Sequence, residues 1–289
     1  MHHNIIFDFG AQYELIDCGN GYKLEKFGNI ILSRPEPQAL WDKILSQDLW
    51  DSKYHAHFTR DKAYPEKGMW TKKNNTPYYW HISYKNSDFA MHMKLELTSF
   101  KHIGLFPEQC ANWQYIYKKT KILTKPKVLN LFAYTGGASL AAKYAGAEVV
   151  HVDAVKQVIT WANENKEINK LHDIVWVVED VLKFVKREVR RGKLYDGIII
   201  DPPAYGRGPE GEKWILEDTL NTLLKECKTI LSPNAHAFMI LNMYAMGYSP
   251  TLAYSILKSH FADKDIEYGE LIAQATSGAL LPMSVFARF

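Results

Sequence analysis

The sequence predicts an α/β protein in which a small β-rich region precedes a larger, mostly parallel sheet. Two observations carry this prediction. Up to about residue 100, apolar and polar residues alternate between turn signals, which is typical of antiparallel strands. From about residue 127, short apolar runs alternate with helical patterns, which is typical of a parallel sheet with helices on both faces. We therefore expect one domain over residues 1–100 and another over residues 101–289.

Two hairpins are predicted in the first domain. One joins residues 13–17 to residues 22–27 through the turn Gly19-Asn20-Gly21, because two alternating segments flank residues that favour a tight turn. The other joins residues 78–84 to residues 89–97. Both support a small β-rich domain, for which we expect a role in binding the substrate.

The segments between these hairpins are less regular. A third strand is expected over residues 30–32, and a short helix over residues 35–45, which begin with a proline. Residues 50–77 are polar and aromatic without clear periodicity. We expect a long ordered loop there, and loops of that length are usually functional or mobile.

The second domain contains seven predicted strands, at residues 128–132, 148–153, 174–178, 195–201, 235–241, 266–272 and 284–288. Helical patterns separate the first six, so these strands should be of the parallel type. The last connection contains Gly278 and Pro282 and is too short for a crossover helix, so the final strand should run antiparallel.

Composition and charge exclude several classes of protein. The chain of 289 residues is 47% hydrophobic and 23% charged, which is ordinary for a globular protein, and its net charge of +3 does not by itself indicate nucleic acid. Cys18, Cys110 and Cys227 show neither zinc spacing nor a disulfide framework. We expect no metal and a cytoplasmic location. No signal peptide and no membrane-spanning apolar run is recognisable, so no membrane association is expected.

The most informative motif is Asp201-Pro202-Pro203-Ala204-Tyr205, directly after the apolar run 197–200. The prolines stiffen the turn and remove two backbone donors. Carboxylate and carbonyl oxygens can then face the crevice at the carboxyl end of the sheet, where open α/β folds bind ligands. Asp201, the Pro202 carbonyl and Tyr205 are therefore candidate catalytic groups that hold an amino group or ring nitrogen of a planar substrate. The alternative is an ordinary proline turn.

A nucleotide site is predicted from the ends of the first three strands. Gly136 and Gly137 allow the backbone to pass close to a ligand, and the helix that begins near Ser139 directs backbone donors toward it. Asp153 ends the second strand, where an acid commonly binds ribose hydroxyls. Glu179 and Asp180 follow the third strand and are candidates for the adenine amino group, although Asp180 is equally well explained as a helix N-cap. An NAD-dependent oxidoreductase is disfavoured because the G-x-G-x-x-G fingerprint is missing.

Together, residues 130–137 (Asn-Leu-Phe-Ala-Tyr-Thr-Gly-Gly), Val152-Asp153-Ala154 and the Asp-Pro-Pro motif resemble class I S-adenosylmethionine-dependent methyltransferases. They look most like the bacterial 23S rRNA methyltransferase group. Residues 104–113 and 205–214 also resemble segments of that group. The resemblance covers roughly residues 100–289. It implies a Rossmann-like class I methyltransferase sheet of six parallel strands plus one antiparallel strand, S-adenosylmethionine as the cofactor and ribosomal RNA as a partner. The cofactor site that it implies consists of Phe132, Ala133, Thr135, Gly136, Ser139, Asp153, Ala154, Glu179, Asp180 and Asp201.

The type of nucleophile follows from the position of the cysteines. Methylation of a pyrimidine at carbon 5 needs a cysteine that adds to the ring, and relatives that do this place it just after the fifth strand. Residues 238–245 contain none, and Cys227 is expected in the core. A nitrogen nucleophile is therefore favoured. Asn242 and Tyr244 are expected to line the substrate side, although Tyr244 is equally well explained as a packed rim residue.

Two basic segments are candidates for contact with phosphate. Residues 206–213 are expected to form a mobile loop over the site, from which Arg207 and Lys213 contact phosphate or simply face solvent. A second basic run, at helical spacing, is either a nucleic-acid face or a solvated helix face; it consists of Lys183, Lys186, Arg187, Arg190, Arg191 and Lys193.

Three functional hypotheses follow from these features. The first is an enzyme that methylates a nitrogen in RNA. The second is a methyltransferase for a nitrogen in a protein or small molecule, which stays open because no separate RNA-binding module is recognisable. The third is a catalytically inactive protein that binds S-adenosylmethionine, which the intact Asp-Pro-Pro and Gly-Gly motifs disfavour.

Overall fold

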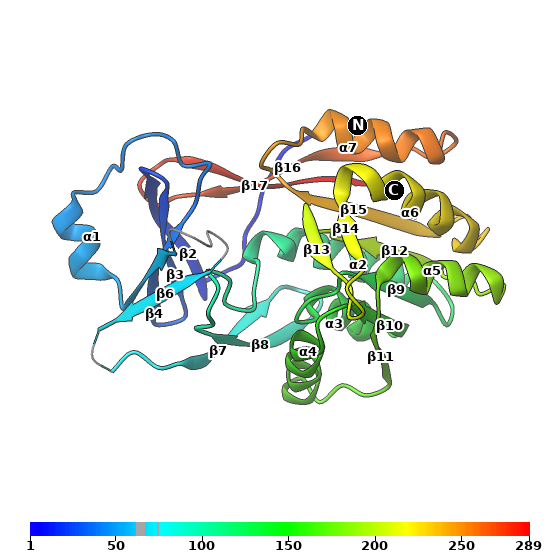
Figure 1. The fold of residues 1–289 in the computed structure, drawn as a ribbon, viewed down its shortest axis with the longest axis horizontal. Helices are drawn as coiled ribbons and strands as arrows, with labels where there is room; N and C mark the ends of the chain where they lie inside the picture. Colours follow the sequence, from blue (N-terminus) through cyan, green and yellow to red (C-terminus); the bar gives the residue numbers. More distant parts are fainter. Residues whose placement is uncertain (62–66, 74) are drawn as a thin grey trace. The chain divides into compact units, whose positions relative to one another are not determined.

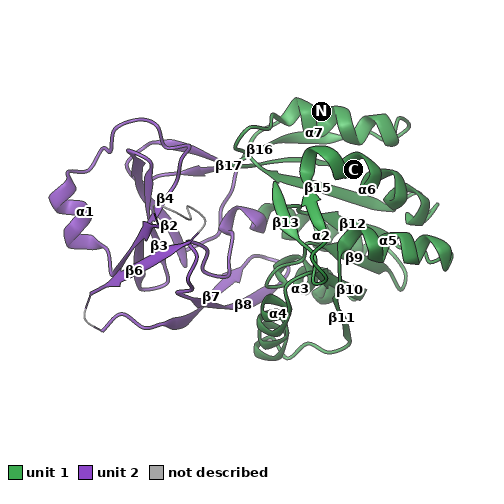
Figure 2. Cartoon of the chain, viewed as in Figure 1, with its two compact units in different colours: residues 1–5, 111–271, 283–289 green, residues 6–110, 272–282 purple. Residues whose placement is uncertain are grey.

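The computed structural model describes residues 1–61, 67–73 and 75–289. It divides into two compact units (Figure 2). Unit 1 contains residues 1–5, 111–271 and 283–289, and unit 2 contains residues 6–110 and 272–282. The chain thus changes unit after residues 5, 110, 271 and 282, whereas the sequence pattern shows one change near residue 100. Hydrophobic periodicity does not reveal which unit a carboxyl-terminal strand joins.

The sheet of unit 1 confirms the expected α/β architecture (Figure 1). Its strand order is β1 (Ile5–Ile6), β16 (Glu267–Gln274), β17 (Leu280–Arg288), β15 (Phe238–Tyr244), β12 (Gly197–Ile200), β9 (Lys127–Leu131), β10 (Glu148–Asp153) and β11 (Ile174–Val178). From β15 to β11 all neighbours pair in parallel. The last strand, β17, pairs with β15 in the antiparallel sense, as the short connection before it predicted.

Helices connect these strands, as the alternating pattern predicted. They are α2 (Cys110–Lys121), α3 (Gly137–Tyr144), α4 (Lys156–Ile168), α5 (Val181–Arg190), α6 (Leu216–Ile230) and α7 (Pro250–His260). Helix α6 packs against both α5 and α7. The four residues of β12 are all buried, because helices cover a parallel sheet on both faces. Within the described ranges, no helix has the length and apolar character needed to cross a membrane.

Unit 2 is built on mostly antiparallel strands. A five-stranded sheet has the order β2 (Tyr13–Gly19), β3 (Tyr22–Phe27), β4 (Ile30–Pro35), β5 (Ala56–Arg60) and β6 (Gly68–Lys72), and β7 (Tyr79–Lys85) pairs with β8 (Ala90–Glu96). Both predicted hairpins are confirmed. The first turn places Asn20 at φ 52° and Gly21 at φ 75°, the left-handed conformation that tight hairpin turns require.

The predicted helix over residues 35–45 is wrong, since that segment forms turns and irregular backbone. Its backbone bonds instead to the first hairpin turn: Asn20 N donates to Trp41 O at 2.7 Å and Gly21 N donates to Ala39 O at 2.8 Å. The helix of this region is α1 (Gln47–Lys53), which Ser46 caps through a hydrogen bond from Leu49 N. Tertiary hydrogen bonds therefore outweighed the local proline signal.

The predicted long loop over residues 50–77 is also wrong. The segment contains the end of α1 and the strands β5 and β6, while residues 62–66 and 74 lie outside the described residues. Strand β5 pairs in parallel with β4 and antiparallel with β6. These strands show no clear alternation of apolar and polar residues in the sequence. They form because they pair with neighbouring strands, which hydrophobic periodicity did not reveal.

Candidate active site

The candidate residues of unit 1 lie in one row at the carboxyl edge of its sheet. The pairs that join β10 to β9, β9 to β12 and β12 to β15 end level with one another. The next residues along these strands are Asp153, Phe132, Asp201 and Asn242. The register of the parallel strands thus brings together side chains that are far apart in the sequence.

The loop between β9 and α3 has an unusual backbone. Phe132, Tyr134 and Gly136 adopt left-handed conformations with φ of 55°, 49° and 91°. For residues other than glycine, such a conformation costs about 1–3 kcal/mol and is concentrated at functional sites. Ala133 N donates to Val152 O at 3.1 Å, which ties the loop to β10. The sequence offered no signal for the positive φ of Phe132 and Tyr134.

The two glycines of this loop have partners within the protein. A Cβ on Gly136 would lie 3.2 Å from the Ala162 Cβ, and one on Gly137 would lie 2.6 Å from the Trp113 ring. Gly137 is therefore required for close packing of α3 against Trp113, and Gly136 chiefly for its left-handed backbone. The predicted contact of Gly136 with a cofactor stays a prediction.

Backbone donors orient the carboxylate of Asp153. Tyr134 N donates to Oδ2 and Val155 N donates to Oδ1, both at 2.9 Å. Burial raises the pKa of Asp153, and these backbone hydrogen bonds act against the rise. A carboxylate oxygen has room for more than one hydrogen bond, so Asp153 retains the capacity to accept from the hydroxyls of a ligand. Ala154 follows it and is partly buried.

Two other predicted cofactor residues stabilise the loop and the start of α3. The Ser139 side chain is buried, where its Oγ accepts from Asn130 Nδ2 at 2.9 Å and bonds His151 Nδ1 at 3.0 Å. Thr135 is buried too, and its carbonyl accepts from Asn165 Nδ2 at 2.9 Å. The first N–H groups of α3 have no partner within the helix. They remain the expected donors to a ligand.

The acids after β11 already have partners in the protein. Asp180 caps α5, because its Oδ1 accepts from Lys183 N at 2.9 Å. The cap interpretation is therefore confirmed. Glu179 forms an ion pair with Arg187 at 2.6 Å. Both acids are partly buried, and their contact with an adenine amino group stays a prediction.

Asp201 is bound by the amide of the neighbouring strand. Asn242 Nδ2 donates to Asp201 Oδ1 at 2.8 Å. Burial raises the pKa of the Asp201 carboxyl to about 6, and the hydrogen bond from Asn242 acts against the rise. The carboxyl is therefore mostly ionised at neutral pH, which lies only slightly above this pKa. Among the hydrogen bonds of the described chain, none has the Pro202 carbonyl as acceptor.

The expected loop over residues 206–213 is instead the turn of a hairpin formed by β13 (Tyr205–Arg207) and β14 (Lys213–Ile215). Trp214 anchors it: the side chain is 3% exposed, its Nε1 donates to the Pro203 carbonyl at 2.7 Å, and its ring lies 4.6 Å from that of Phe132. Sequence reasoning missed this residue, although a tryptophan in a glycine-rich, charged stretch was a signal. The proline turn is therefore held by the hairpin that follows it.

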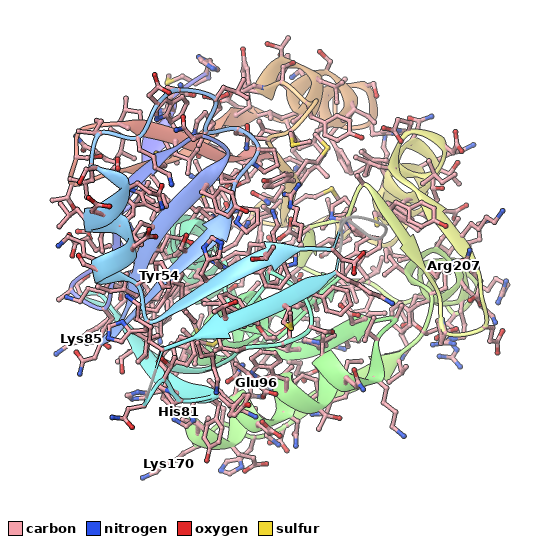
Figure 3. All side chains as sticks on the ribbon, turned by 60° about the vertical axis from the view of Figure 1, so that its left-hand side comes forward. Tyr54, His81, Lys85, Glu96, Lys170 and Arg207 are labelled. Atoms are coloured by element: carbon pink, nitrogen blue, oxygen red, sulfur yellow. The ribbon has the colours of Figure 1, made fainter. Side chains whose placement is uncertain are left out.

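Exposed groups surround this turn. Tyr205 is 56% exposed and is free to stack on a planar partner. Tyr244 is 36% exposed, at the end of β15. Arg207 is exposed as well and is labelled in Figure 3. These side chains can contact a substrate at the carboxyl edge without displacing the core.

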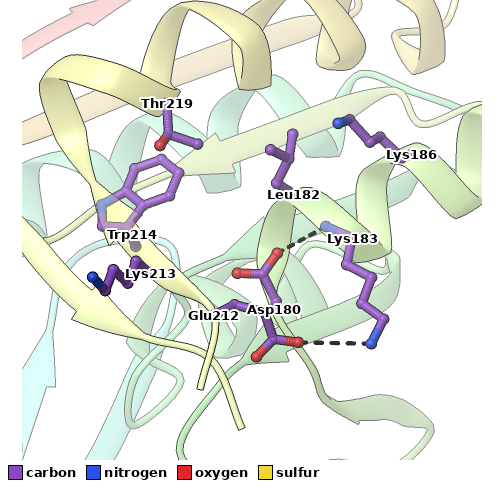
Figure 4. Close-up of a pocket in the computed structure, with 8 residues that line it drawn as sticks. All are labelled: Asp180, Leu182, Lys183, Lys186, Glu212, Lys213, Trp214 and Thr219. Carbon is purple, nitrogen blue, oxygen red and sulfur yellow. Dashed lines mark hydrogen bonds and ion pairs between the residues drawn. The ribbon is translucent and has the colours of Figure 1, made fainter. Parts of the chain in front are cut away.

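An open pocket of about 350 Å³ lies between α5 and the β13–β14 hairpin (Figure 4). It is lined by Asp180, Leu182, Lys183, Lys186, Glu212, Lys213, Trp214 and Thr219. Lys183 contacts Glu210 at 2.6 Å and Glu212 at 3.6 Å. Two further members of the basic run also form ion pairs: Arg187 pairs with Glu179, and Arg191 pairs with Glu188. The run therefore supports α5 and the hairpin as well as facing solvent.

The cysteines are all buried. Cys227 lies in α6 with 0% exposure, so its predicted place in the core is confirmed. Burial raises the pKa of its thiol well above the usual range. A buried, protonated thiol is a poor nucleophile.

Known proteins share this arrangement. The family model for S-adenosylmethionine-dependent methyltransferases matches residues 47–262. Ribosomal RNA large subunit methyltransferase K/L of Shewanella sp. (strain ANA-3) is 32% identical over 154 residues, which cover 51% of this chain and 21% of that protein. Ribosomal RNA large subunit methyltransferase I of Aeromonas salmonicida is 28% identical over 186 residues, which cover 60% of this chain and 43% of that protein. The chain thus spans less than half the length of these curated relatives.

A solved structure matches nearly the whole chain. The S-adenosylmethionine-dependent methyltransferase from Agrobacterium tumefaciens is 36% identical, with a TM-score of 0.91 over 99% of this chain and 93% of that one. The family model covers most of this chain as well. The chain therefore belongs to the family of S-adenosylmethionine-dependent methyltransferases.

Proposed function

We propose that this enzyme transfers a methyl group from S-adenosylmethionine to a nitrogen in RNA, with ribosomal RNA as the substrate class. The observation that carries the proposal is the partly buried Asp201 carboxylate, which Asn242 orients at 2.8 Å beside the proline turn. Two relatives named as ribosomal RNA large subunit methyltransferases support RNA as the substrate. We also propose a cytoplasmic location and a substrate-binding role for the β-rich residues 1–100.

The residues at the carboxyl edge fit the cofactor in their chemistry. Asp153 offers carboxylate oxygens for ribose hydroxyls, and the start of α3 offers backbone donors for a carboxylate. The proposed apolar and polar wall consists of Phe132, Ala133, Thr135, Gly136, Ser139, Ala154, Glu179 and Asp180. When bound, S-adenosylmethionine would supply a methyl group on a positively charged sulfur. A nitrogen lone pair can attack that methyl group, with the sulfur as the leaving group.

The proposed role of Asp201 is to orient the nitrogen that accepts the methyl group. An exocyclic amino group carries two hydrogens, and two acceptors, Asp201 and the Pro202 carbonyl, are present. Hydrogen bonds to both turn the nitrogen lone pair toward the methyl group, and such positioning supplies about 7–11 kcal/mol of a barrier in favourable cases. As the N–C bond forms and the S–C bond breaks, the nitrogen loses a proton toward Asp201. Tyr205 is proposed to stack on the base.

Transfer of label from methyl-labelled S-adenosylmethionine tests the proposal. Label should enter RNA in a mixture of ribosomal RNA, protein and small molecules, and digestion should place it on a base nitrogen. Label in protein or small molecules alone would contradict the RNA substrate. Label on a ring carbon would contradict the nitrogen target, and absence of transfer together with cofactor binding would favour an inactive binding protein.

Asp153→Ala should weaken S-adenosylmethionine binding by about 1.5–3 kcal/mol, because a hydrogen bond to a charged, partly buried acceptor is lost. Calorimetry with S-adenosylmethionine and, separately, with NAD measures this loss. Asp263→Ala, which removes an exposed acid after α7, is the matched control and should bind normally. Tight NAD binding without a response to S-adenosylmethionine would contradict the assignment of this site.

Replacement of all three cysteines by alanine should leave the transfer rate unchanged. The three thiols are buried, and alanine avoids placing a hydroxyl in an apolar environment. Single-turnover transfer from labelled cofactor, measured alongside thermal unfolding, checks this. A folded triple variant that binds the cofactor but has lost transfer would contradict direct methyl transfer in which no cysteine adds to the substrate.

A further inference from the structure

A chain of buried polar side chains runs from Asp201 into the interior of unit 1. Asn242 Oδ1 accepts from Asn112 Nδ2 at 3.3 Å and from Ser284 Oγ at 3.1 Å. Asn112 Oδ1 in turn accepts from Arg288 Nη1 at 3.0 Å. Asn242, Asn112, Ser284 and Arg288 are each at most 5% exposed. Such polar groups are costly in a core unless they are fully bonded.

The chain has a defined direction. The Arg288 guanidinium donates to Asn112, Asn112 donates to Asn242, and Asn242 donates to Asp201. An amide can turn over and exchange its donor and acceptor sides. Because a guanidinium can only donate, Arg288 fixes the Asn112 amide, whose NH₂ group then requires the Asn242 oxygen, so that the Asn242 NH₂ group faces Asp201. Arg288 is itself held by Glu267, whose carboxylate accepts from Nε at 3.1 Å and from Nη2 at 2.9 Å.

We propose that Asn112, Ser284 and Arg288 are positioning residues for the methyl transfer, because they hold the Asn242 amide in the orientation that donates to Asp201. The inference rests on the proposed function of Asp201. Their effect passes through Asn242, which joins this buried chain to the Asp-Pro-Pro turn.

The direction of the expected effect follows from the electrostatics around Asp201. A donor to a carboxylate favours its ionised form, so loss of the Asn242 donor raises the pKa of Asp201 further above its usual range. Ionisable residues that adjoining segments bring to this edge include Asp153, Tyr134, Tyr205 and Tyr244.

Asn112→Asp is the sharpest variant. It keeps an acceptor for Arg288 but replaces the donor to Asn242 with a second acceptor, so the Asn242 amide should turn and present its oxygen to Asp201. The Asp201 carboxyl signal in a carbon-13 NMR titration, identified by its absence in Asp201→Asn, should then titrate at least about one pH unit higher, a tenfold change in ionisation. The midpoint of the pH–rate profile should rise with it, while cofactor affinity stays the same.

Ser284→Ala removes one of the two donors to Asn242 and should shift the titration in the same direction. Ser284→Thr keeps the hydroxyl and should restore the parent titration. Ser284→Ala also carries the test if Asn112→Asp does not fold. An unchanged Asp201 titration in the folded variants would overturn the inference, whatever their activity. A shifted titration in a protein that methylates no RNA would support the positioning chain and reject the proposed substrate.

Discussion

Asp201→Asn should lower the rate of methyl transfer about 100-fold or more, the range for a group that orients or deprotonates the nucleophile. Asparagine keeps the shape of the side chain but removes the carboxylate that the target nitrogen faces. The affinity for S-adenosylmethionine should stay nearly the same, because the loss falls on the transition state. Single-turnover transfer from labelled cofactor measures the rate, and calorimetry measures the affinity.

The stability of this variant separates catalysis from a purely structural role. Because the folded-state pKa of Asp201 is raised to about 6, ionisation of this partly buried carboxyl lowers stability as the pH rises from about 4 through 6. At pH 8 Asp201→Asn should therefore be at least as stable as the parent. If Asp201 only held the proline turn, the variant would lose thermal stability and cofactor affinity together. Undiminished turnover would end its catalytic assignment.

The parent enzyme should show the same ionisation in its pH dependence. If the carboxylate is the active form, the transfer rate should rise about tenfold per pH unit below pH 6 and level off above it. Asp201→Asn should lack this rise in its residual activity. A parent rate that is constant from pH 5 to pH 8, with chemistry as the slow step, would show that ionisation of Asp201 does not control transfer.

The second large effect is expected in unit 2, from Arg34→Met. Arg34 binds the fully buried Glu25 carboxylate through Nε at 2.9 Å and Nη2 at 2.6 Å. Lys23, at 3.5 Å, is the other cation beside it. Removal of one partner of a buried ion pair leaves an uncompensated charge and costs about 3–5 kcal/mol. Urea unfolding should show this loss of stability.

Two further variants control this experiment. Lys127→Met breaks the exposed pair with Glu148, at 3.9 Å, and should change stability by less than about 1 kcal/mol. The double variant Glu25→Leu/Arg34→Met should recover much of the lost stability, because it leaves no charge at these two positions and Lys23 keeps its ion pair with Glu36 at 3.3 Å. A single Arg34→Met variant as stable as the parent would show that Lys23 alone compensates Glu25.

The ion pair should also contribute to acid unfolding. Burial raises the pKa of Glu25, but Arg34 and Lys23 outweigh burial and hold it below its usual value. A depressed carboxyl pKa stabilises the folded protein above the unfolded-state pKa of about 4.3. That contribution is lost as the pH falls from this value through the lower folded one.

Local patterns in the sequence were sufficient to predict most of the sheet and the residues at its carboxyl edge. Apolar runs alternating with helical patterns predicted the parallel strands, because a strand covered on both faces must be apolar throughout. The apolar strands end abruptly in acidic residues, so Asp153 and Asp201 could be recognised from the sequence as strand-end residues. The short connection that contains Gly278 and Pro282 correctly predicted an antiparallel last strand.

Only the tertiary structure decided which side chains support that edge. Asn112 meets Asn242 across 130 positions of sequence, and Arg288 meets Asn112 across 176. Hydrophobic periodicity shows which face of a segment is buried, but the partner of a buried polar group depends on strand order and register. For the same reason the backbone of residues 39–41 bonds to a distant hairpin turn instead of forming the predicted helix. The sequence by itself therefore determined the family, the sheet and the edge at which the candidate residues lie, whereas long-range packing determined the hydrogen-bond partners of those residues.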